Sequence, residues 1–211
     1  MRKPGSMRAL EEFGRLRLSE SFFMRDFLYS EIAGFYGLSN IPDDPDLAIA
    51  AGRGLCENLL EPLRAALGRI SIRSAYRTPE VNRFGNERGL NCAKNEASFA
   101  SHIWDRRDAR GEMGARATVV VNAFIPYYRR TGDWEALAWW AHDHLPYSEI
   151  QFFPKYAAFN LGWHEAPKQT IYSYIPPRRG WLTKPGMANH AGDHSAAYAA
   201  FLATIPRRPT D

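Results

Sequence analysis

The feature that most constrains the fold is a leucine-rich segment with helical spacing, followed at once by an alternating segment. Between residues 46 and 67 the leucines recur on one face of a helix, which predicts a long buried helix. Pro62 lacks a backbone donor and is expected to kink it. Gly68 suits a helix C-cap, and residues 69–74 alternate as a strand that enters the core. The leucines are Leu47, Leu55, Leu59, Leu60, Leu63 and Leu67.

The rest of the chain places short helices before this segment and strands after it. Ser19 is expected to cap a short helix that carries Phe22 and Phe27 on its apolar face, and a further helical turn follows near Ser30. Helices first and an antiparallel sheet afterwards predict an α+β domain. The predicted strands are 114–121, 147–153 and 158–164, and the later helices are 134–145 and 196–202.

The sequence divides into a loose charged tail over residues 1–17, one domain over 18–175, and an extension over 176–211 rich in Pro, Gly and Arg. Residues 78–113 form a long polar connection. Connections of that length inside compact domains are uncommon and often functional.

Composition excludes several classes of protein. The net charge of +4 comes from 27 basic and 23 acidic residues, a mild excess that predicts no specific nucleic-acid partner. Cys56 and Cys92 are too few for a disulfide framework. No signal peptide or membrane span is visible, so the protein is expected to be cytoplasmic as synthesised. Any role outside the cell would need another route, such as lysis or assembly into a particle, and the oligomeric state stays open.

The residues suited to chemistry are widely spaced. Ser74-Ala75-Tyr76-Arg77 is followed by Asn82, and two isolated histidines, His102 and His164, come later. Separated histidines on one domain are typical of a zinc site, and an arginine beside them suits an anionic substrate.

Several segments in register resemble the M15 peptidases, the D-alanyl-D-alanine carboxypeptidase family that includes phage peptidoglycan endopeptidases. The resemblance covers residues 18–82 and implies a Hedgehog/DD-peptidase-like fold, in which N-terminal helices pack on a small antiparallel sheet. The segments are Leu18-Ser19-Glu20-Ser21-Phe22, Ser30-Glu31-Ile32-Ala33, Asn40-Ile41-Pro42, Leu59-Leu60-Glu61-Pro62-Leu63-Arg64, and Ser74-Ala75-Tyr76-Arg77 with Asn82.

The resemblance implies one Zn²⁺ held by a histidine, an aspartate and a second histidine. His102 would be the first ligand and His164, in Gly162-Trp163-His164, the last. The family pattern Ser-x-His-x-x-Gly-x-Ala-x-Asp can be aligned in two ways. One makes Asp108 the ligand, with Asp105 as a substitute. The other places Thr118 there, and a neutral threonine is a poor replacement for a carboxylate.

The family also has an acidic general base near the last histidine. Glu149 and Glu165 are the candidates, and Glu149 is preferred because a hairpin turn near Lys155 would bring it alongside Trp163 or His164. The resemblance further implies that Arg77, with Ser74, binds the substrate or its developing oxyanion.

Two functions remain open. The first is a zinc-dependent peptidase that hydrolyses peptide bonds in peptidoglycan peptides. The alternative is a catalytically inactive protein of the same fold with a binding or structural role in a virion or envelope. A second histidine-rich segment, with His190, Asp193 and His194, resembles a metal-ligand cluster by composition, whereas His142 and His144 suit the C-terminus of a helix.

Overall fold

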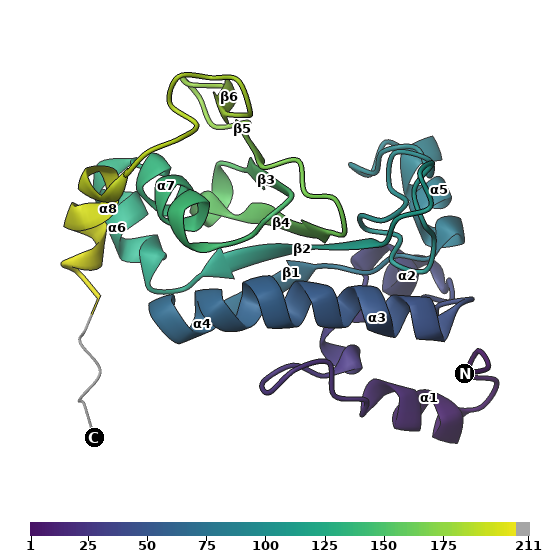
Figure 1. Cartoon of the computed structure of the whole chain (residues 1–211). Helices are drawn as coiled ribbons and strands as arrows, with labels where there is room; N and C mark the ends of the chain where they lie inside the picture. The colour runs from purple at the N-terminus through teal and green to yellow at the C-terminus, as the bar shows by residue number, and fades with distance from the viewer. Residues whose placement is uncertain (206–211) are drawn as a thin grey trace, which may run out of the picture.

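The computed structural model describes residues 1–205 as one six-stranded sheet covered by helices (Figure 1). The strand order is β1-β2-β4-β3-β5-β6, and neighbours are antiparallel except for the parallel pair β3 and β5. The predicted α+β class is confirmed. Residues 206–211 of the expected extension lie outside this description. The strands are β1 (Ile70–Ser74), β2 (Gly114–Val121), β3 (Glu149–Phe152), β4 (Phe159–His164), β5 (Thr170–Ser173) and β6 (Gly180–Thr183).

The leucine-rich segment is helical, as predicted, and runs along one face of the sheet as α3 and α4 (Figure 1). A π-helical turn, Cys56–Leu60, joins the two helices just before Pro62, and the Glu61 N–H bonds to the Cys56 carbonyl. The wider turn adapts the backbone to the proline, which has no N–H to donate. The helices are α1 (Met7–Gly14), α2 (Glu31–Tyr36), α3 (Pro45–Leu55), α4 (Glu61–Leu67), α5 (Pro79–Glu87), α6 (Phe124–Thr131), α7 (Glu135–His144) and α8 (Ser195–Leu202).

The core lies between these helices and the neighbouring strands β2 and β4. Alternate residues of β2, Ala115, Ala117 and Val119, are fully buried, and so is Leu161 of β4. The close approach of α3 to the sheet requires Gly54, because a Cβ there would come within 2.6 Å of the Trp163 ring. Each large apolar side chain buried in this layer contributes about 1.5–3 kcal/mol to folding.

The N-terminal region is more ordered than a loose tail. Ser6 caps α1 by accepting a hydrogen bond from the Ala9 N–H, and Phe13 is buried in the core. Ser19 does not cap a helix. Its hydroxyl donates to Glu61 on α4 at 2.7 Å, and the phenylalanines that follow form only a 3-10 turn, Met24–Phe27.

The boundary expected after residue 175 falls inside the sheet. β6 pairs with β5, and α8 packs on α7 with Phe201 fully buried. The segment that looked like a surface extension therefore completes one edge of the sheet and covers one end of the core. Helix α6, between β2 and α7, was also not predicted.

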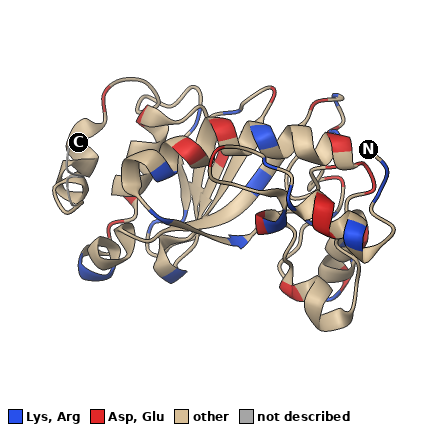
Figure 2. Cartoon of the chain, turned by 90° about the horizontal axis from the view of Figure 1, so that it is seen from below, with Lys and Arg blue, Asp and Glu red and all other residues tan. Residues whose placement is uncertain are grey.

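Charge is spread over the molecule. Basic and acidic segments are interspersed along the elements in Figure 2, and many pair locally, as Arg8 does with Glu12 on α1. Within residues 1–205, no helix combines the length and apolar character needed to cross a membrane.

Candidate functional site

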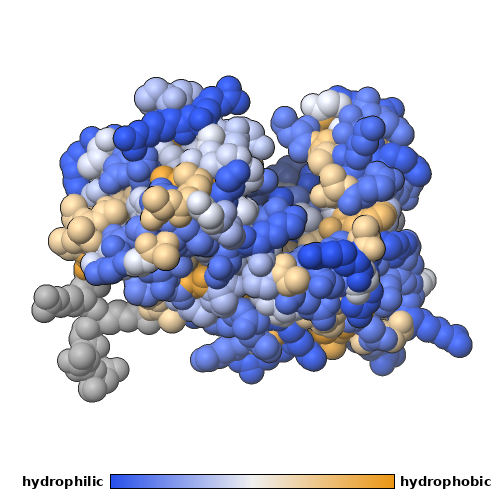
Figure 3. Space-filling view, turned by 45° about the horizontal axis from the view of Figure 1, so that its top comes forward, coloured by the Kyte–Doolittle hydropathy of each residue, from blue (hydrophilic) through white to orange (hydrophobic). Residues whose placement is uncertain are grey.

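A cleft of about 1050 Å³ opens on the sheet face opposite α3. Figure 3 shows the surface hollowed between two raised parts of the molecule. One wall comes from residues 91–102 and 108–110 of the long polar connection, and the other from β3, β4 and the segment up to Tyr174. The long polar connection, whose length indicates a functional role, thus forms one wall of the cleft.

Strand alternation selects the side chains that reach the cleft. Ala115, Ala117 and Leu161 point to the core, so their neighbours Arg116 on β2 and Asn160 and His164 on β4 point to the opposite face. The antiparallel register places Gly114 opposite His164. A polar group of side chains therefore covers the sheet between two walls.

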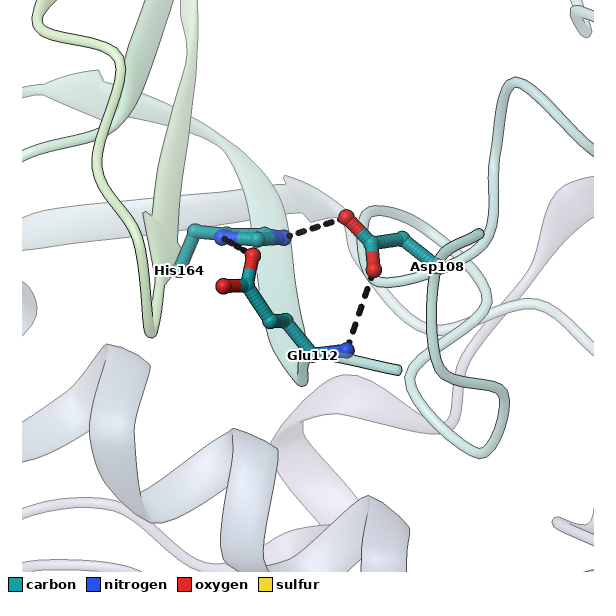
Figure 4. A group of neighbouring side chains, drawn as sticks. All are labelled: Asp108, Glu112 and His164. Carbon is teal, nitrogen blue, oxygen red and sulfur yellow. Dashed lines mark hydrogen bonds and ion pairs between the residues drawn. The ribbon is translucent and has the colours of Figure 1, made fainter. Parts of the chain in front are cut away.

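Three side chains at the edge of this cleft form a group that could hold a metal ion. Asp108, Glu112 and His164 each offer one donor atom, and the three atoms lie within 4.8 Å of one another. His164 extends from the end of β4 toward the loop that carries the two acids (Figure 4). Its Nε2 is 3.3 Å from Asp108 Oδ2, and its Nδ1 is 3.8 Å from Glu112 Oε2.

The loop itself orients Asp108. Its Oδ1 accepts hydrogen bonds from the N–H groups of Glu112 (3.0 Å) and Arg110 (2.9 Å), which leaves Oδ2 for His164. These backbone bonds, that from Glu112 first, hold the pKa of Asp108 below its usual value. The carboxylate is thus ionised and aimed at the imidazole.

Two backbone groups of Ala166 face His164 Nδ1, and each suits a different tautomer of the ring. The Ala166 N–H (3.0 Å) and carbonyl oxygen (3.1 Å) both lie within reach of His164 Nδ1. When Nδ1–H donates to the carbonyl, Nε2 has a free lone pair for a metal, the arrangement common for ligating histidines. One imidazole and two carboxylates are a donor set that suits Zn²⁺.

Arg110 competes with a metal for the same acids. Its guanidinium lies 2.7 Å from Glu112 Oε2 and 3.6 Å from Asp108 Oδ2. A bound cation would share these carboxylates with Arg110 or displace it, and Arg110 is exposed enough to move.

Of the three predicted ligands, the structure brings Asp108 and His164 together and leaves His102 outside the group. His102 is buried in the cleft floor, and its Nδ1 lies 2.8 Å from the Ala75 carbonyl oxygen. Because a carbonyl only accepts, Nδ1 carries the proton and Nε2 is the acceptor. Burial first, and then the charges of Arg77 and Arg116, hold the pKa of His102 well below its usual value, so the ring is neutral.

The other predicted site residues are distributed unevenly. Arg77 and Glu149 line the cleft, whereas Ser74 lies at the end of β1 opposite Thr118, away from the lining. Glu149 is opposite Gly162 in the hairpin register, one to two residues from the predicted partners Trp163 and His164. It forms ion pairs with Arg116 and, at 3.0 Å, with Lys168.

The substitute ligands have structural partners. Asp105 is almost fully buried, and its Oδ2 accepts from the Asp43 N–H at 2.8 Å. Thr118 donates to Asn160 at 2.6 Å across the sheet. Neither belongs to the metal-compatible group.

The second histidine-rich segment packs on α7, away from the cleft. His142 contacts the Tyr147 hydroxyl (2.7 Å) and the His190 carbonyl (2.8 Å), while His194 contacts Asp143 (2.7 Å) and stacks on Trp139 at 4.1 Å. Asp193 binds the N–H and hydroxyl of Ser195 instead. This cluster fixes the C-terminal segment on α7.

Two residues were not predicted from the sequence: Glu112 of the metal-compatible group and Arg116 of the cleft lining. Glu112 enters the site only because the turn from Asp108 to Glu112 brings the two acids together, with the Asp108 N–H bonded to the Glu112 carbonyl at 3.0 Å. Arg116 could have been found from the strand alternation, since it shares a face with Thr118.

Comparison of the chain with protein-family models, with curated proteins and with solved structures finds no match.

Proposed function

We propose that the chain is a zinc-dependent peptidase, similar to the M15 enzymes, that hydrolyses peptide bonds in peptidoglycan peptides. The observation that carries the proposal is the meeting of Asp108, Glu112 and His164 beside a cleft of about 1050 Å³. This volume is at the upper end of typical ligand sites and suits a short peptide. The fold class and the contact between Asp108 and His164 support the resemblance found in the first half of the sequence.

In this proposal Asp108, Glu112 and His164 hold the metal at the cleft edge. A zinc ion bound there supplies Lewis acidity that polarises a peptide carbonyl and acidifies a water molecule. The residues of the chain then place the substrate and move protons.

Glu149 is our candidate proton acceptor. Arg116 and Lys168 contact its carboxylate and offset the effect of burial, so its pKa is below the usual value and the group is ionised. Glu149 would take a proton from the attacking water and pass it to the amine that leaves. Arg77, on the same cleft floor, would bind the anionic part of the substrate.

The metal content of the purified chain and its hydrolysis of peptidoglycan fragments test the proposal. We expect one zinc ion per chain by mass spectrometry, together with release of amino acid or peptide from muropeptides. His164→Ala should remove both. His144→Ala is the matched control, because His144 is exposed and contacts the Tyr198 hydroxyl outside the cleft. A chain that takes up no zinc and cleaves no fragment would overturn the proposal.

A second function, a binding protein without catalysis, is favoured by two observations. His102 is not part of the metal-compatible group, and Arg110 already supplies a positive charge to Asp108 and Glu112. Such a protein would bind peptidoglycan peptides without zinc and without turnover. The same measurements separate the two functions.

A further inference from the structure

Two arginines that are far apart in the sequence, Arg77 and Arg116, both line the cleft. The backbone N–H of Arg77 donates to the His102 carbonyl at 2.8 Å, and that of Arg116 donates to the Ser101 carbonyl at 2.9 Å. Because the two acceptors are consecutive residues, the segment after β1 and the strand β2 are held next to each other. Both arginine side chains line the same cleft.

Among residues 1–205, the Arg77 guanidinium has no carboxylate partner. Its Nη1 contacts the Cys92 sulfur at 2.9 Å, and its Nε is buried without a hydrogen-bond partner among residues 1–205. Over the same residues, no acidic group lies within ion-pair distance of its guanidinium. A charge taken out of water without a counter-charge destabilises a fold. A cleft that contains such an unpaired positive charge is suited to bind an anion.

Arg116 is only partly neutralised. It contacts Glu149 and, at 3.5 Å, Gln151, and its Nε is also buried without a partner in the described part of the chain. Glu149 is shared with Lys168. Arg77, Arg116 and Lys168 thus bring three positive charges to a floor on which Glu149 brings one negative charge.

The remaining groups around the floor do not cancel this excess. Asp108 and Arg110, which also line the cleft, pair with each other, and Glu96 is exposed at the rim. His102 also lines the cleft and is neutral, because burial first, and then the charges of Arg77 and Arg116, lower its pKa. The floor therefore carries a net positive charge where the two unpartnered Nε–H groups are located.

We propose that Arg77 and Arg116 together form a binding site for the carboxylate of a ligand that enters the cleft. A guanidinium offers N–H groups in a planar fork that matches the two oxygens of a carboxylate. The site goes beyond the proposed peptidase, because it requires no metal. Identification of the ligand as the substrate, a peptide with a free C-terminal carboxylate, rests on the proposed function; the binding itself does not.

Titration calorimetry on the full chain, freed of metal with a chelator, tests the site. The probes are N-acetyl-D-alanyl-D-alanine, the same dipeptide as its C-terminal amide, and inorganic phosphate. We expect the acid to bind about tenfold or more tightly than the amide. Phosphate should compete with the acid, because it shares the oxyanion chemistry. Phosphate binding without any binding of the acid would overturn the carboxylate assignment.

Arginine variants test whether binding of the acid requires Arg77 and Arg116 or only the positive charge of the protein. Arg77→Gln and Arg116→Gln should each weaken binding of the acid about tenfold. The control is Arg178→Gln, because Arg178 is an exposed arginine paired with Glu135, and binding should be unchanged. Circular dichroism checks that each variant is folded.

Glu149→Gln gives a test in the opposite direction, in case the arginine variants do not fold. Removal of the carboxylate frees Arg116 and should strengthen binding of the acid several-fold, about threefold or more. Equal binding of acid and amide, binding that persists in both arginine variants, or no binding to the metal-free chain would overturn the inference. None of these results depends on zinc uptake or hydrolysis, so the failure of the peptidase proposal is distinguishable.

Discussion

The molecule has two regions that combine histidine with aspartate, and they differ in how far their donor atoms are already occupied. In the cluster on α7, each ring nitrogen of His142 and His194 contacts an oxygen atom at 2.7–3.1 Å. At the cleft edge, the contacts of His164 with Asp108 and Glu112 are longer, 3.3 and 3.8 Å. We call the first region, in which every nitrogen of these two rings is hydrogen-bonded, the clasp. We call the second region the open site, because it keeps donor atoms available for a metal ion. Composition alone does not tell them apart.

The strongest test of this difference is the removal of an acid from the clasp. Asp143 accepts hydrogen bonds from His194 Nδ1, the His194 N–H and the Tyr198 hydroxyl, and its side chain is 14% exposed. Asp143→Ala should therefore lower the free energy of unfolding by about 2–3 kcal/mol, measured with urea. Asp108→Ala in the metal-free chain is expected to lower the free energy of unfolding by clearly less. Equal losses would erase the distinction between clasp and open site.

A second test acts on the open site through the backbone. A Cβ at Gly114 would collide with the Ala100 carbonyl oxygen and come within 2.8 Å of the His164 ring. Gly114→Ala should cost about 2 kcal/mol of stability, because the carbonyl belongs to the backbone and cannot swing away. Zinc binding should weaken as His164 is displaced. Gly34→Ala is the control, because a Cβ there meets open space and alanine favours the helix α2, so stability should not fall. Gly132→Ala would be a poor control, since that glycine has a positive φ.

The pH dependence of stability sharpens the comparison for buried imidazoles. The pKa of His102 is well below its usual value in the folded chain, so only the unfolded chain takes up this proton as the pH falls below about 6.5. Stability should decrease from pH 6.5 to 5 by up to about 1.4 kcal/mol per pH unit. Urea titrations of His102→Asn should show a shallower slope. His190, whose pKa is lowered by burial and by His142 and His194, is less buried and should contribute less.

The smallest expected effect concerns the Arg110 guanidinium, which lies at the open site. Arg110 contacts both acids, so Arg110→Gln should raise zinc affinity about threefold, the magnitude of an exposed ion pair. Calorimetric titration with zinc measures the change, and Arg107→Gln is the matched control on the same loop, paired with Glu165. A fall in zinc affinity would show that Arg110 supports the group instead of competing with it.

The parts of the fold that follow from local pattern were predictable. The leucine spacing predicted α3 and α4, and alternation predicted β1, β2 and β4, because helical and strand periods are local properties of the sequence. β5 and β6 were missed because they are short and are separated by a segment that contains Pro176 and Pro177, which are typical of turns. The place of β5 depends on pairing with β3, which is not its neighbour along the chain, and β6 in turn pairs with β5.

The candidate site was predictable only in part, for a related reason. The proximity of Asp108 and His164 agrees with the ungapped alignment, although their role as ligands stays a prediction. Glu112 joins them through a turn whose geometry no periodicity encodes. His102 is outside this group, and its bond to the Ala75 carbonyl is a tertiary contact that sequence spacing does not reveal.

The parallel pairing of β5 with β3 has a consequence for folding during synthesis on the ribosome. A nascent chain that has emerged only as far as β4 exposes the open edge of β3, and unpaired edges promote aggregation. The edge is covered only once residues 170–183 leave the ribosome. We therefore expect the chain to depend on chaperones during this interval, and fragments that stop before β5 to accumulate as insoluble material.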